Sequence, residues 1–542
     1  MARIVTYEIN GIEGGISPLQ YKAGANQYMM AYGIDPDYPN LQSSGIRTAG
    51  LISPVPMTKF SGTEITGTPN WIITQPKTTN SFVYASDGKL HSFNSSLVMR
   101  TSDEASTSLP ISITGGAGNG AVYYNNFIYL AEASDISQYG GMDQAASIAK
   151  TENVWTGSKF SKTGLSNTAY PTMRGVIMPN HSMHLHGDNA VYICDVLPTG
   201  AASGASGRGT LHRLKTKRTT IDGDTDDSSG YNVLDLPYGF YPSDIESYGT
   251  DLLIAAFQTT DTTINQGNAK LFLWDITADS WYREIYVPDP LVTAIVNVNG
   301  IPIIYSGNVN NGFRVSAYLG GNTVTPLKFF EEGNPPFAGA VDAFMTRAVF
   351  GTGGTFPENV ISVFALGTKI PDLEQSVLHN IIRATQLPNS ATVGTVASLK
   401  YVQQASGIIP RLVVGWADGA GTNGLDKYSS TATLNSLFKT SLFVPGGQFS
   451  LLEIEIPFSN PITSTVSIIP KVYYDDENTA VTLATINNTN YASQEKVFYK
   501  RPELAVNGRK NFSLQLGIAG TMTWAISFPI RITVEIYDDE SN

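Results

Sequence analysis

The chain has 542 residues, of which 42% are hydrophobic and 15% are charged, and its formal net charge is −12. A chain of this length exceeds one compact core, so we expect two or three domains. The shortage of positive charge excludes a protein that grips DNA, because phosphate binding requires clustered Lys and Arg. With 51 Gly and 27 Tyr, the composition is typical of short strands joined by tight turns, and we expect an all-β fold.

Residues 1–60 carry many chain breakers and little hydrophobic periodicity. Gly and Pro recur within residues 14–18 and 33–39, and Tyr28 and Tyr32 are candidate anchors. We predict an extended N-terminal arm that lies on its own domain or on a neighbouring subunit. The first residues lack the apolar core of a signal peptide, and no run is long enough to span a membrane, so we expect synthesis in the cytoplasm.

One sequence pattern recurs four times between residues 121 and 305. It consists of an apolar or aromatic stretch, a two-residue polar turn and four or five β-forming residues. The copies occupy residues 121–130, 184–193, 247–256 and 296–305, and their turns are 62, 62 and 50 residues apart. Asn and Gly tolerate the positive φ that a tight hairpin turn requires. Each copy is therefore predicted to form a β-hairpin.

A second type of hairpin lies between these copies, at residues 270–275 and 281–285. Further strands of this type are expected at residues 82–85, 313–318, 360–365 and 411–416. Two hairpins per repeat make a four-stranded sheet, and such sheets repeated at this spacing are the blades of a β-propeller. We predict a β-propeller over residues 61–440. The alternative is a row of unrelated β-hairpins in sandwiches.

The last hundred residues have a different pattern. Residues 451–456 alternate apolar and polar side chains, as a half-buried strand does. Further strands are expected at residues 468–474, 511–516 and 530–537. We predict an antiparallel β-sandwich over residues 441–542. Helix is scarce, and residues 372–384 are the best helical candidate.

Two closely spaced histidines are the first candidate metal ligands. His184 and His186 would share one face of a strand, as a pair of ligands must. The sequence offers no third ligand, so we interpret both, together with His181, as surface or turn histidines.

The segment from Asp222 to Asp227 resembles the start of a calcium loop. An EF-hand needs Gly at the sixth position and Glu at the twelfth, where this chain has Asp227 and Val233. We interpret the segment as an acidic solvent loop, with a calcium site of another type as the alternative.

Candidate catalytic groups are isolated in the sequence. A glycoside hydrolase needs two carboxylates at a fixed separation, and nothing pairs Asp244, Glu246, Glu284 or Asp342. The single cysteine, Cys194, lies in an apolar strand-like run and is interpreted as a buried structural thiol. The chain also lacks a nucleophile elbow and a P-loop. We predict no catalytic, cofactor or metal site, and hence a non-enzymatic protein.

Both ends of the chain resemble the virion proteins of tailed bacterial viruses. At the N-terminus the resemblance lies in Asn10-Gly11-Ile12-Glu13-Gly14-Gly15-Ile16-Ser17-Pro18 and in Ser44-Gly45-Ile46-Arg47. At the C-terminus it lies in Lys500-Arg501-Pro502-Glu503-Leu504, Phe512-Ser513-Leu514-Gln515-Leu516 and Pro529-Ile530-Arg531-Ile532-Thr533-Val534-Glu535. The layout of the whole chain is similar to the propeller-bearing tail nozzle of short-tailed phages.

This resemblance implies a structural role in the virion tail. The implied partners are copies of the same chain in a ring, expected to be a hexamer, neighbouring adaptor and fibre proteins, and double-stranded DNA that passes without specific binding. An acidic wall agrees with such passage, because like charge prevents adhesion. The alternatives are a tail fibre that binds a receptor or glycan, with Trp155, Trp274 and Trp281 stacking on sugars, and a propeller glycan hydrolase.

Overall fold

The computed structural model describes most of the chain. The described residues are 2–12, 14–17, 27–35, 41–42, 45–46, 52, 57–60, 65–75, 80–102, 108–113, 115–124, 127–132, 136–140, 155–160, 170, 172–173, 176–197, 208–215, 221–222, 233–258, 268–308, 312–355, 360–367, 378–383, 394–404, 410–418, 421–428, 436–475, 480–502, 509–520 and 525–537. The chain divides into two compact units, one of residues 1–58, 363–388 and 428–542, the other of residues 59–362 and 389–427.

Strands make up nearly all the regular structure, and the all-β prediction is confirmed. The described helices are α1 (Asn488–Tyr491) and a 3-10 turn at Ala338–Ala340. The helical candidate at residues 372–384 is wrong where the chain is described, because Leu378–Arg383 form strand β33. Ile381 and Ile382 are fully buried there, and packing in a sheet favours such β-branched residues.

Seven antiparallel sheets of four or five strands follow one another along the chain, and each is a blade of a β-propeller, as predicted. The strands of each blade are given in chain order, except that β6 comes last in blade 7 although it precedes the others in the sequence. Blade 1 has β7 (Pro69–Thr74), β8 (Ser81–Ala85), β9 (Lys89–Phe93) and β10 (Ile111–Ser112); blade 2 has β11 (Gly116–Tyr124), β12 (Phe127–Glu132), β13 (Ile136–Gly140) and β14 (Trp155–Phe160). Blade 3 has β17 (Met183–His186), β18 (Ala190–Leu197), β19 (Arg208–Lys215), β20 (Ile221–Asp222) and β21 (Leu234–Tyr238); blade 4 has β22 (Phe240–Tyr248), β23 (Asp251–Gln258), β24 (Ala269–Trp274) and β25 (Arg283–Val287). Blade 5 has β26 (Leu291–Val298), β27 (Ile301–Gly307), β28 (Phe313–Ala317) and β29 (Thr325–Phe330); blade 6 has β30 (Val341–Phe344), β31 (Arg347–Thr355), β32 (Val360–Leu366) and β33. Blade 7 has β34 (Gly394–Val402), β35 (Arg411–Asp418), β36 (Asn423–Tyr428) and β6 (Met57–Lys59).

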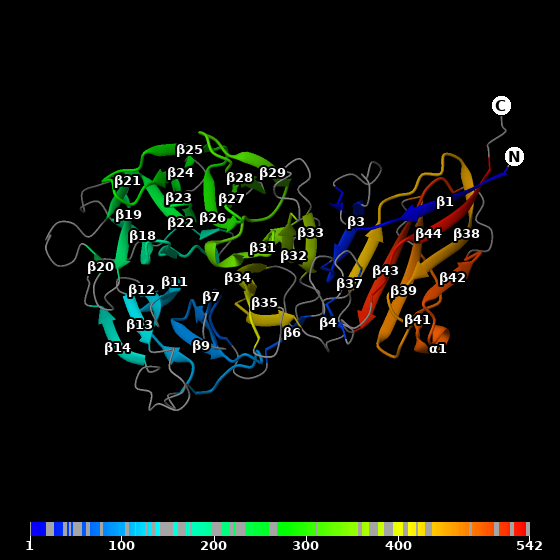
Figure 1. Ribbon diagram of the computed structural model, residues 1–542, viewed down its shortest axis with the longest axis horizontal. Helices are drawn as coiled ribbons and strands as arrows, with labels where there is room; N and C mark the ends of the chain where they lie inside the picture. Colours follow the sequence, from blue (N-terminus) through cyan, green and yellow to red (C-terminus); the bar gives the residue numbers. More distant parts are fainter. Residues whose placement is uncertain are drawn as a thin grey trace. The chain divides into compact units, whose positions relative to one another are not determined.

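The first strands of the seven blades form a closed ring, and we call them the inner strands. Each contacts the next in the order β7, β11, β17, β22, β26, β30 and β34, and β34 contacts β7 again (Figure 1). The last sheet is completed by β6, which comes from the beginning of the chain. The ring is therefore closed by a strand that precedes all other blade strands in the sequence.

The four recurrent hairpins are confirmed as the first two strands of blades 2 to 5. In blade 4, Tyr248 pairs with Asp251 across a turn in which Gly249 has a φ of 63°. In blade 5, Asn299 and Gly300 have φ values of 53° and 87°. Positive φ at both central residues is the conformation that tight hairpin turns require and that Asn and Gly adopt readily. The predicted hairpin at residues 270–275 and 281–285 is β24 and β25.

A hydrogen bond joins the inner part of every pair of neighbouring blades. In order around the ring, these bonds run from Asn70 Nδ2 to Gly118 O (3.1 Å), His181 N to Asn119 O (3.3 Å), Ser182 Oγ to Asp244 Oδ1 (2.8 Å), Ser243 Oγ to Val292 O (2.7 Å), Thr293 Oγ1 to Pro336 O (2.6 Å), Tyr401 N to Asp342 Oδ2 (2.9 Å) and Ser398 Oγ to Pro69 O.

Three of these donors, Asn70, Ser243 and Thr293, sit where the register of an inner strand shifts by one residue. A β-bulge leaves one residue out of the ladder and redirects its side chain. Here the redirected side chain donates a hydrogen bond toward the next blade. The bulge in each of these inner strands therefore helps to join neighbouring blades in the closed ring.

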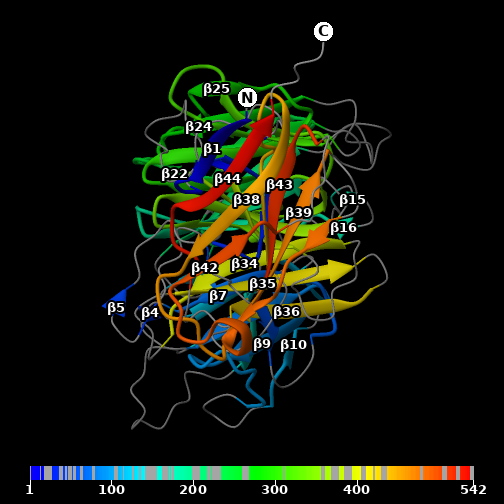
Figure 2. The ribbon, with the colours of Figure 1, turned by 90° about the vertical axis from the view of Figure 1, so that its right-hand side faces the viewer.

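The unit made of residues 1–58, 363–388 and 428–542 contains a β-sandwich (Figure 2). One sheet has the order β1 (Ala2–Ile9), β44 (Ile530–Tyr537), β38 (Gln448–Pro457) and β42 (Lys496–Lys500). The second has the order β2 (Gly15–Ile16), β3 (Gln27–Tyr32), β37 (Ser436–Thr440), β43 (Phe512–Gly520), β39 (Val466–Tyr474) and β40 (Val481–Thr482), with β41 (Ile486–Asn487) also paired to β39. Residues of the predicted N-terminal arm supply β1 and β3, so this part of the arm lies on the sandwich. Two short hairpins complete the strands: β4 (Leu41–Gln42) with β5 (Gly45–Ile46), and β15 (Thr172–Met173) with β16 (Val176–Ile177).

The substitution Phe60→Ala tests how much the closing segment stabilises the propeller. Phe60 is buried, its ring lies 5.0 Å from that of Phe93 in blade 1, and its backbone N–H donates to Leu425 O in blade 7. Losing a buried phenyl ring at this junction should lower the free energy of unfolding by about 3 kcal/mol. The control is Phe329→Ala, since Phe329 is 58% exposed and its loss should change stability by less than about 1 kcal/mol. Urea denaturation of both variants gives the comparison, and equal effects would contradict the proposed role of the junction.

Candidate functional site

The structure separates the four candidate carboxylates of the sequence analysis into two groups. Asp244 and Glu246 lie on β22 and Asp342 lies on β30, and both strands belong to the inner ring. Glu284 lies on β25, the outer strand of blade 4, where its carboxylate pairs with Lys270 at 2.6 Å. Glu284 therefore takes no part in any arrangement with the other three.

A set of ionisable groups lies on the inner strands, and we call it the inner-strand cluster: His184, Asp244, Glu246, Asp342 and Lys400. His184 Nε2 lies 3.7 Å from Glu246 Oε1, and Lys400 Nζ lies 2.6 Å from Asp342 Oδ1. Lys400 also interacts electrostatically with Glu246. Blades 4 and 7 are not neighbours in the ring, so this attraction acts between blades that do not adjoin.

Asp244 holds three blades together. Its Oδ1 accepts from Ser182 Oγ in blade 3 at 2.8 Å and from the N–H of Ile245 at 2.9 Å. Its Oδ2 accepts from the N–H of Ile295 in blade 5 at 2.8 Å. Burial raises the pKa of Asp244 to about 7, although these donors favour the ionised form. Both carboxylate oxygens are thus engaged by the protein itself.

Glu246 is the carboxylate of the cluster that keeps some access to solvent. Its side chain is 18% exposed, and burial raises its pKa to about 7, with the charge of Asp244 acting in the same direction. A carboxylic acid that is half-protonated near neutral pH is able to donate or accept a proton. The Asp342 carboxylate, by contrast, forms an ion pair with Lys400 through Oδ1. Its Oδ2 accepts a hydrogen bond from the N–H of Tyr401.

The histidines were wrongly interpreted as surface or turn residues, since His181 and His186 are buried. His184 Nε2 and His186 Nδ1 both bond Ser247 Oγ, at 2.7 and 2.9 Å, which confirms that they share a face. Burial lowers the pKa of His184 to about 4, and His186 adds to the effect. The hydroxyl of Ser247 occupies the position between the two rings. His181 belongs to a different network, with Asp195 at 3.7 Å.

No group of three or more His, Cys, Asp or Glu side chains suited to a metal ion occurs among the described residues. Of the segment from Asp222 to Asp227, which was considered as a calcium loop, residues 223–227 lie outside the described residues. Cys194 is fully buried, and desolvation raises the pKa of its thiol, which confirms the interpretation as a structural thiol.

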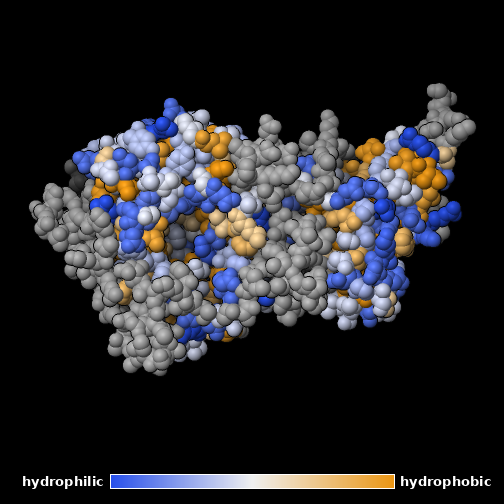
Figure 3. All heavy atoms as spheres, viewed as in Figure 1, coloured by the Kyte–Doolittle hydropathy of each residue, from blue (hydrophilic) through white to orange (hydrophobic). Residues whose placement is uncertain are grey.

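The structure describes the side chains of two of the three tryptophans considered for stacking on sugars, Trp274 and Trp281. For Trp274 the sequence allowed either stacking on a sugar or packing in the sheet. Trp274 is 1% exposed and packs in the core of blade 4, so the packing interpretation is confirmed and the stacking role is wrong. Trp281 packs against the same core and stays partly exposed. Among the described side chains of the propeller, the aromatic residues with the most exposure are Tyr238, Tyr286 and Phe329, at 67%, 55% and 58%. In Figure 3, the visible described surface of the propeller mixes hydrophilic and hydrophobic residues.

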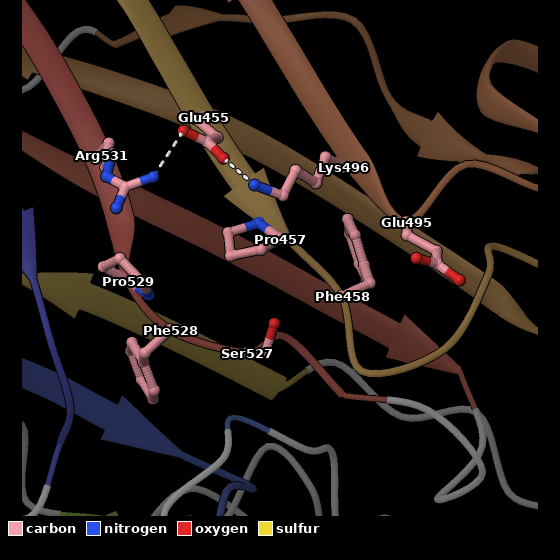
Figure 4. Close-up of a pocket in the computed structure, with 9 residues that line it drawn as sticks. All are labelled: Glu455, Pro457, Phe458, Glu495, Lys496, Ser527, Phe528, Pro529 and Arg531. Atoms are coloured by element: carbon pink, nitrogen blue, oxygen red, sulfur yellow. Dashed lines mark hydrogen bonds and ion pairs between the residues drawn. The ribbon is translucent and has the colours of Figure 1, made fainter.

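The sandwich contains a hollow of about 190 Å³ beside β38, β42 and β44. Its charged lining consists of Glu455, Glu495, Lys496 and Arg531, and its apolar lining includes Phe458 (Figure 4). Glu455 bonds both Lys496 Nζ (2.7 Å) and Arg531 Nη1 (3.3 Å), and these contacts lower its pKa. The charges of the hollow thus neutralise one another.

Lys400 and Ser247 were not identified from the sequence. Lys400 is a single cation within the apolar strand 396–402, and an isolated charge in such a strand is a usable signal for an ion pair. Ser247 carries no such signal, because its role depends on the neighbouring blade.

Comparison with known proteins gives similarity in fold alone. No family model matches the chain, and no curated protein matches it. Among solved structures, the computationally designed Ika8 protein is 10% identical, with a TM-score of 0.35 over 71% of this chain and 97% of that one. U3-55K is 11% identical, with a TM-score of 0.42 over 69% and 98%. The β-propeller domain of Myceliophteria thermophila Cps50 (Swd1) is 8% identical, with a TM-score of 0.43 over 69% and 100%. Within the described residues, no helix has the length and apolar character needed to cross a membrane.

The pH dependence of stability tests the buried state of Glu246. Because its pKa is raised to about 7, the folded protein keeps a proton that the unfolded chain releases above its ordinary pKa of 4.5. The contribution of Glu246 therefore destabilises the fold progressively as pH rises from about 4.5 to 7, by about 3 kcal/mol in total. Glu246→Gln cannot ionise, so its unfolding free energy should depend less on pH over this range.

Chemical denaturation at pH 4.5, 6 and 7.5 measures the difference. Asp244 has a raised pKa too, so part of the slope should remain in the variant. Glu284→Gln on the exposed outer strand is the control and should retain the wild-type slope. A slope in Glu246→Gln equal to that of wild type would show that Glu246 is ionised in the folded protein.

Proposed function

We propose that this chain is a structural component of the tail of a bacterial virus. In this proposal copies of the chain form a ring, expected to be a hexamer, that acts as a nozzle or conduit. The ring retains DNA before infection and lets it pass during ejection. The sequence motifs at both ends of the chain, which resemble tailed-phage virion proteins, are the reason for choosing this setting.

The structural observation that supports the proposal is how the inner strands use their polar groups. Six of the seven blade junctions are bonded through side chains of Asn, Ser, Thr or Asp, and both Asp244 and Asp342 take part. Buried, satisfied polar networks rigidify a fold. A rigid closed body suits a component that must withstand the force of DNA passing through an assembly.

The same observation makes a glycan hydrolase a weaker explanation. Hydrolysis of a glycosidic bond requires two carboxylates that are free to act on the substrate. Asp244 accepts hydrogen bonds from three groups of the protein and Asp342 accepts from two. Glu246 accepts from the N–H of Ser247 at 2.8 Å and is the least engaged acid of the three. The acidic net charge of −12 agrees with transient passage of DNA rather than binding.

The position of the chain in virus particles tests the proposal. Particles purified from a lysate of a bacterium that carries this sequence should contain the chain at a constant copy number, as measured by quantitative mass spectrometry. Class averages of particles labelled on this chain should place it on the tail axis. A peripheral position would favour a fibre that binds a receptor or glycan, and absence from particles would contradict any virion role.

An activity assay separates the hydrolase from both structural alternatives. Wild-type protein incubated with host capsule or lipopolysaccharide should release no reducing ends above the level of Glu246→Gln. Release by wild type that is lost in Glu246→Gln would contradict the structural proposal.

A further inference from the structure

The outward face of the sheet β1-β44-β38-β42 carries a ladder of ion pairs that crosses all four strands. Lys496 on β42 pairs with Glu455 on β38 at 2.7 Å, and Glu455 pairs with Arg531 on β44 at 3.3 Å. Arg531 Nε in turn pairs with Glu8 on β1 at 2.8 Å. Figure 4 shows the two contacts made by Glu455. The signs alternate from one strand to the next, so the ladder is positive at one edge of the sheet and negative at the other.

Both edges of this sheet have an unpaired side. Among the described strands, β1 pairs with β44 alone and β42 pairs with β38 alone. An edge strand presents N–H and C=O groups that can extend the sheet with another chain. The terminal charges of the ladder are accessible as well, since the side chains of Glu8 and Lys496 are 43% and 52% exposed.

Each edge also exposes one large apolar side chain. Ile4 on β1 is 66% exposed, and Phe498 on β42 is 45% exposed. Alternate residues of a strand share a face. Ile4 therefore lies on the same face of β1 as Glu8, and Phe498 lies on the same face of β42 as Lys496. Hydrophobic surface is visible in Figure 3 at the end of the sandwich where β1 begins.

We propose that β1 of one copy of this chain pairs with β42 of a second copy and continues the sheet from subunit to subunit. Successive strands of the sheet are antiparallel, so β42 runs opposite to β1. A second copy displaced along the sheet thus presents its β42 antiparallel to β1. With Glu8 opposite Lys496 of that copy, Thr6 lies opposite Phe498 and Ile4 lies opposite Lys500. Ile4 is then diagonal to Phe498, within reach of apolar contact.

The charge pattern favours this head-to-tail arrangement over pairing of like edges. Two β42 strands paired about Phe498 would place Lys496 opposite Lys500 twice, and like charges directly opposite destabilise a sheet. Two β1 strands paired about Thr6 would place Ile4 opposite Glu8. Pairing β1 with β42 instead adds a Glu8–Lys496 contact that continues the alternation of the ladder into the next copy.

The contact uses a different edge on each of the two copies, so it is heterologous. A heterologous contact generates a closed ring when its rotation closes and a filament when it does not. This inference deepens the ring-forming part of the proposed function and supplies the surface through which copies would meet.

Engineered disulfides test the pairing and its register. Cys194 is the single cysteine of the sequence and is buried, so introduced cysteines are the reactive thiols. The full-length double variant Thr6→Cys/Phe498→Cys should form interchain disulfides under mild oxidation, and mixing the two single variants should give a crosslinked dimer. Neither single variant should crosslink alone. Crosslinking of a single variant would overturn the head-to-tail arrangement in favour of like-edge pairing, and absence of crosslinks in all samples would overturn self-pairing at these edges.

A charge swap distinguishes a broken interface from a damaged fold. Glu8→Lys and Lys496→Glu should each weaken self-association by about tenfold, measured by sedimentation equilibrium. An equimolar mixture of the two variants should recover wild-type self-association. When the two variants alternate, the residues at positions 8 and 496 that meet at each contact again carry opposite charges. Glu284→Lys on β25 is the matched control and should associate as wild type. Loss without recovery in the mixture would contradict the proposed contact.

The two proposals fail in different ways. Particles that contain the chain on the tail axis, combined with no crosslink and a monomeric wild type, would retain the virion role and remove this interface. Crosslinks and recovery by the mixture, combined with absence from virus particles, would retain the interface and remove the virion role.

Discussion

The fold of the propeller depends on closing a ring of seven blades. Each inner strand must contact two others, and the apolar surfaces between blades are buried only when the last blade meets the first. At that junction Ser398 bonds Pro69 O, and Phe60 packs with residues of blades 1 and 7. A ring that lacks one junction exposes two blade faces to water, so the closure contributes more than its own contacts do.

The need to close the ring determines what the polar residues of the inner strands do. At a bulge, the backbone leaves the ladder and a side chain reaches the next blade, as Ser243 and Thr293 do. Asp244 extends the principle to three blades. These groups stabilise the assembly of blades because a buried donor or acceptor without a partner would cost about 1–3 kcal/mol. The same contacts hold the carboxylates of Asp244 and Asp342 in fixed positions within the ring.

The repeated hairpins were predictable because their information is local. A turn with Asn299-Gly300 between two apolar runs specifies a hairpin from a few adjacent residues, and such hairpins at regular spacing specify a blade. The blade number, the contribution of β6 to blade 7 and the ion pair between Asp342 and Lys400 depend on residues far apart in sequence. No local pattern encodes them. Two predictions failed for the same reason: a helix at residues 372–384 and exposed positions for the histidines. In both cases contacts with neighbouring strands determine the local structure or the burial.

The pairing of β6 and β1 with strands far along the sequence has a consequence for folding during synthesis. Each strand is synthesised hundreds of residues before its partner, which is β36 for β6 and β44 for β1. At a translation rate of about 5–20 residues per second, both strands wait for tens of seconds before a partner exists. The blades between them have time to form individually, and the propeller and the sandwich are both completed only when the final strands emerge.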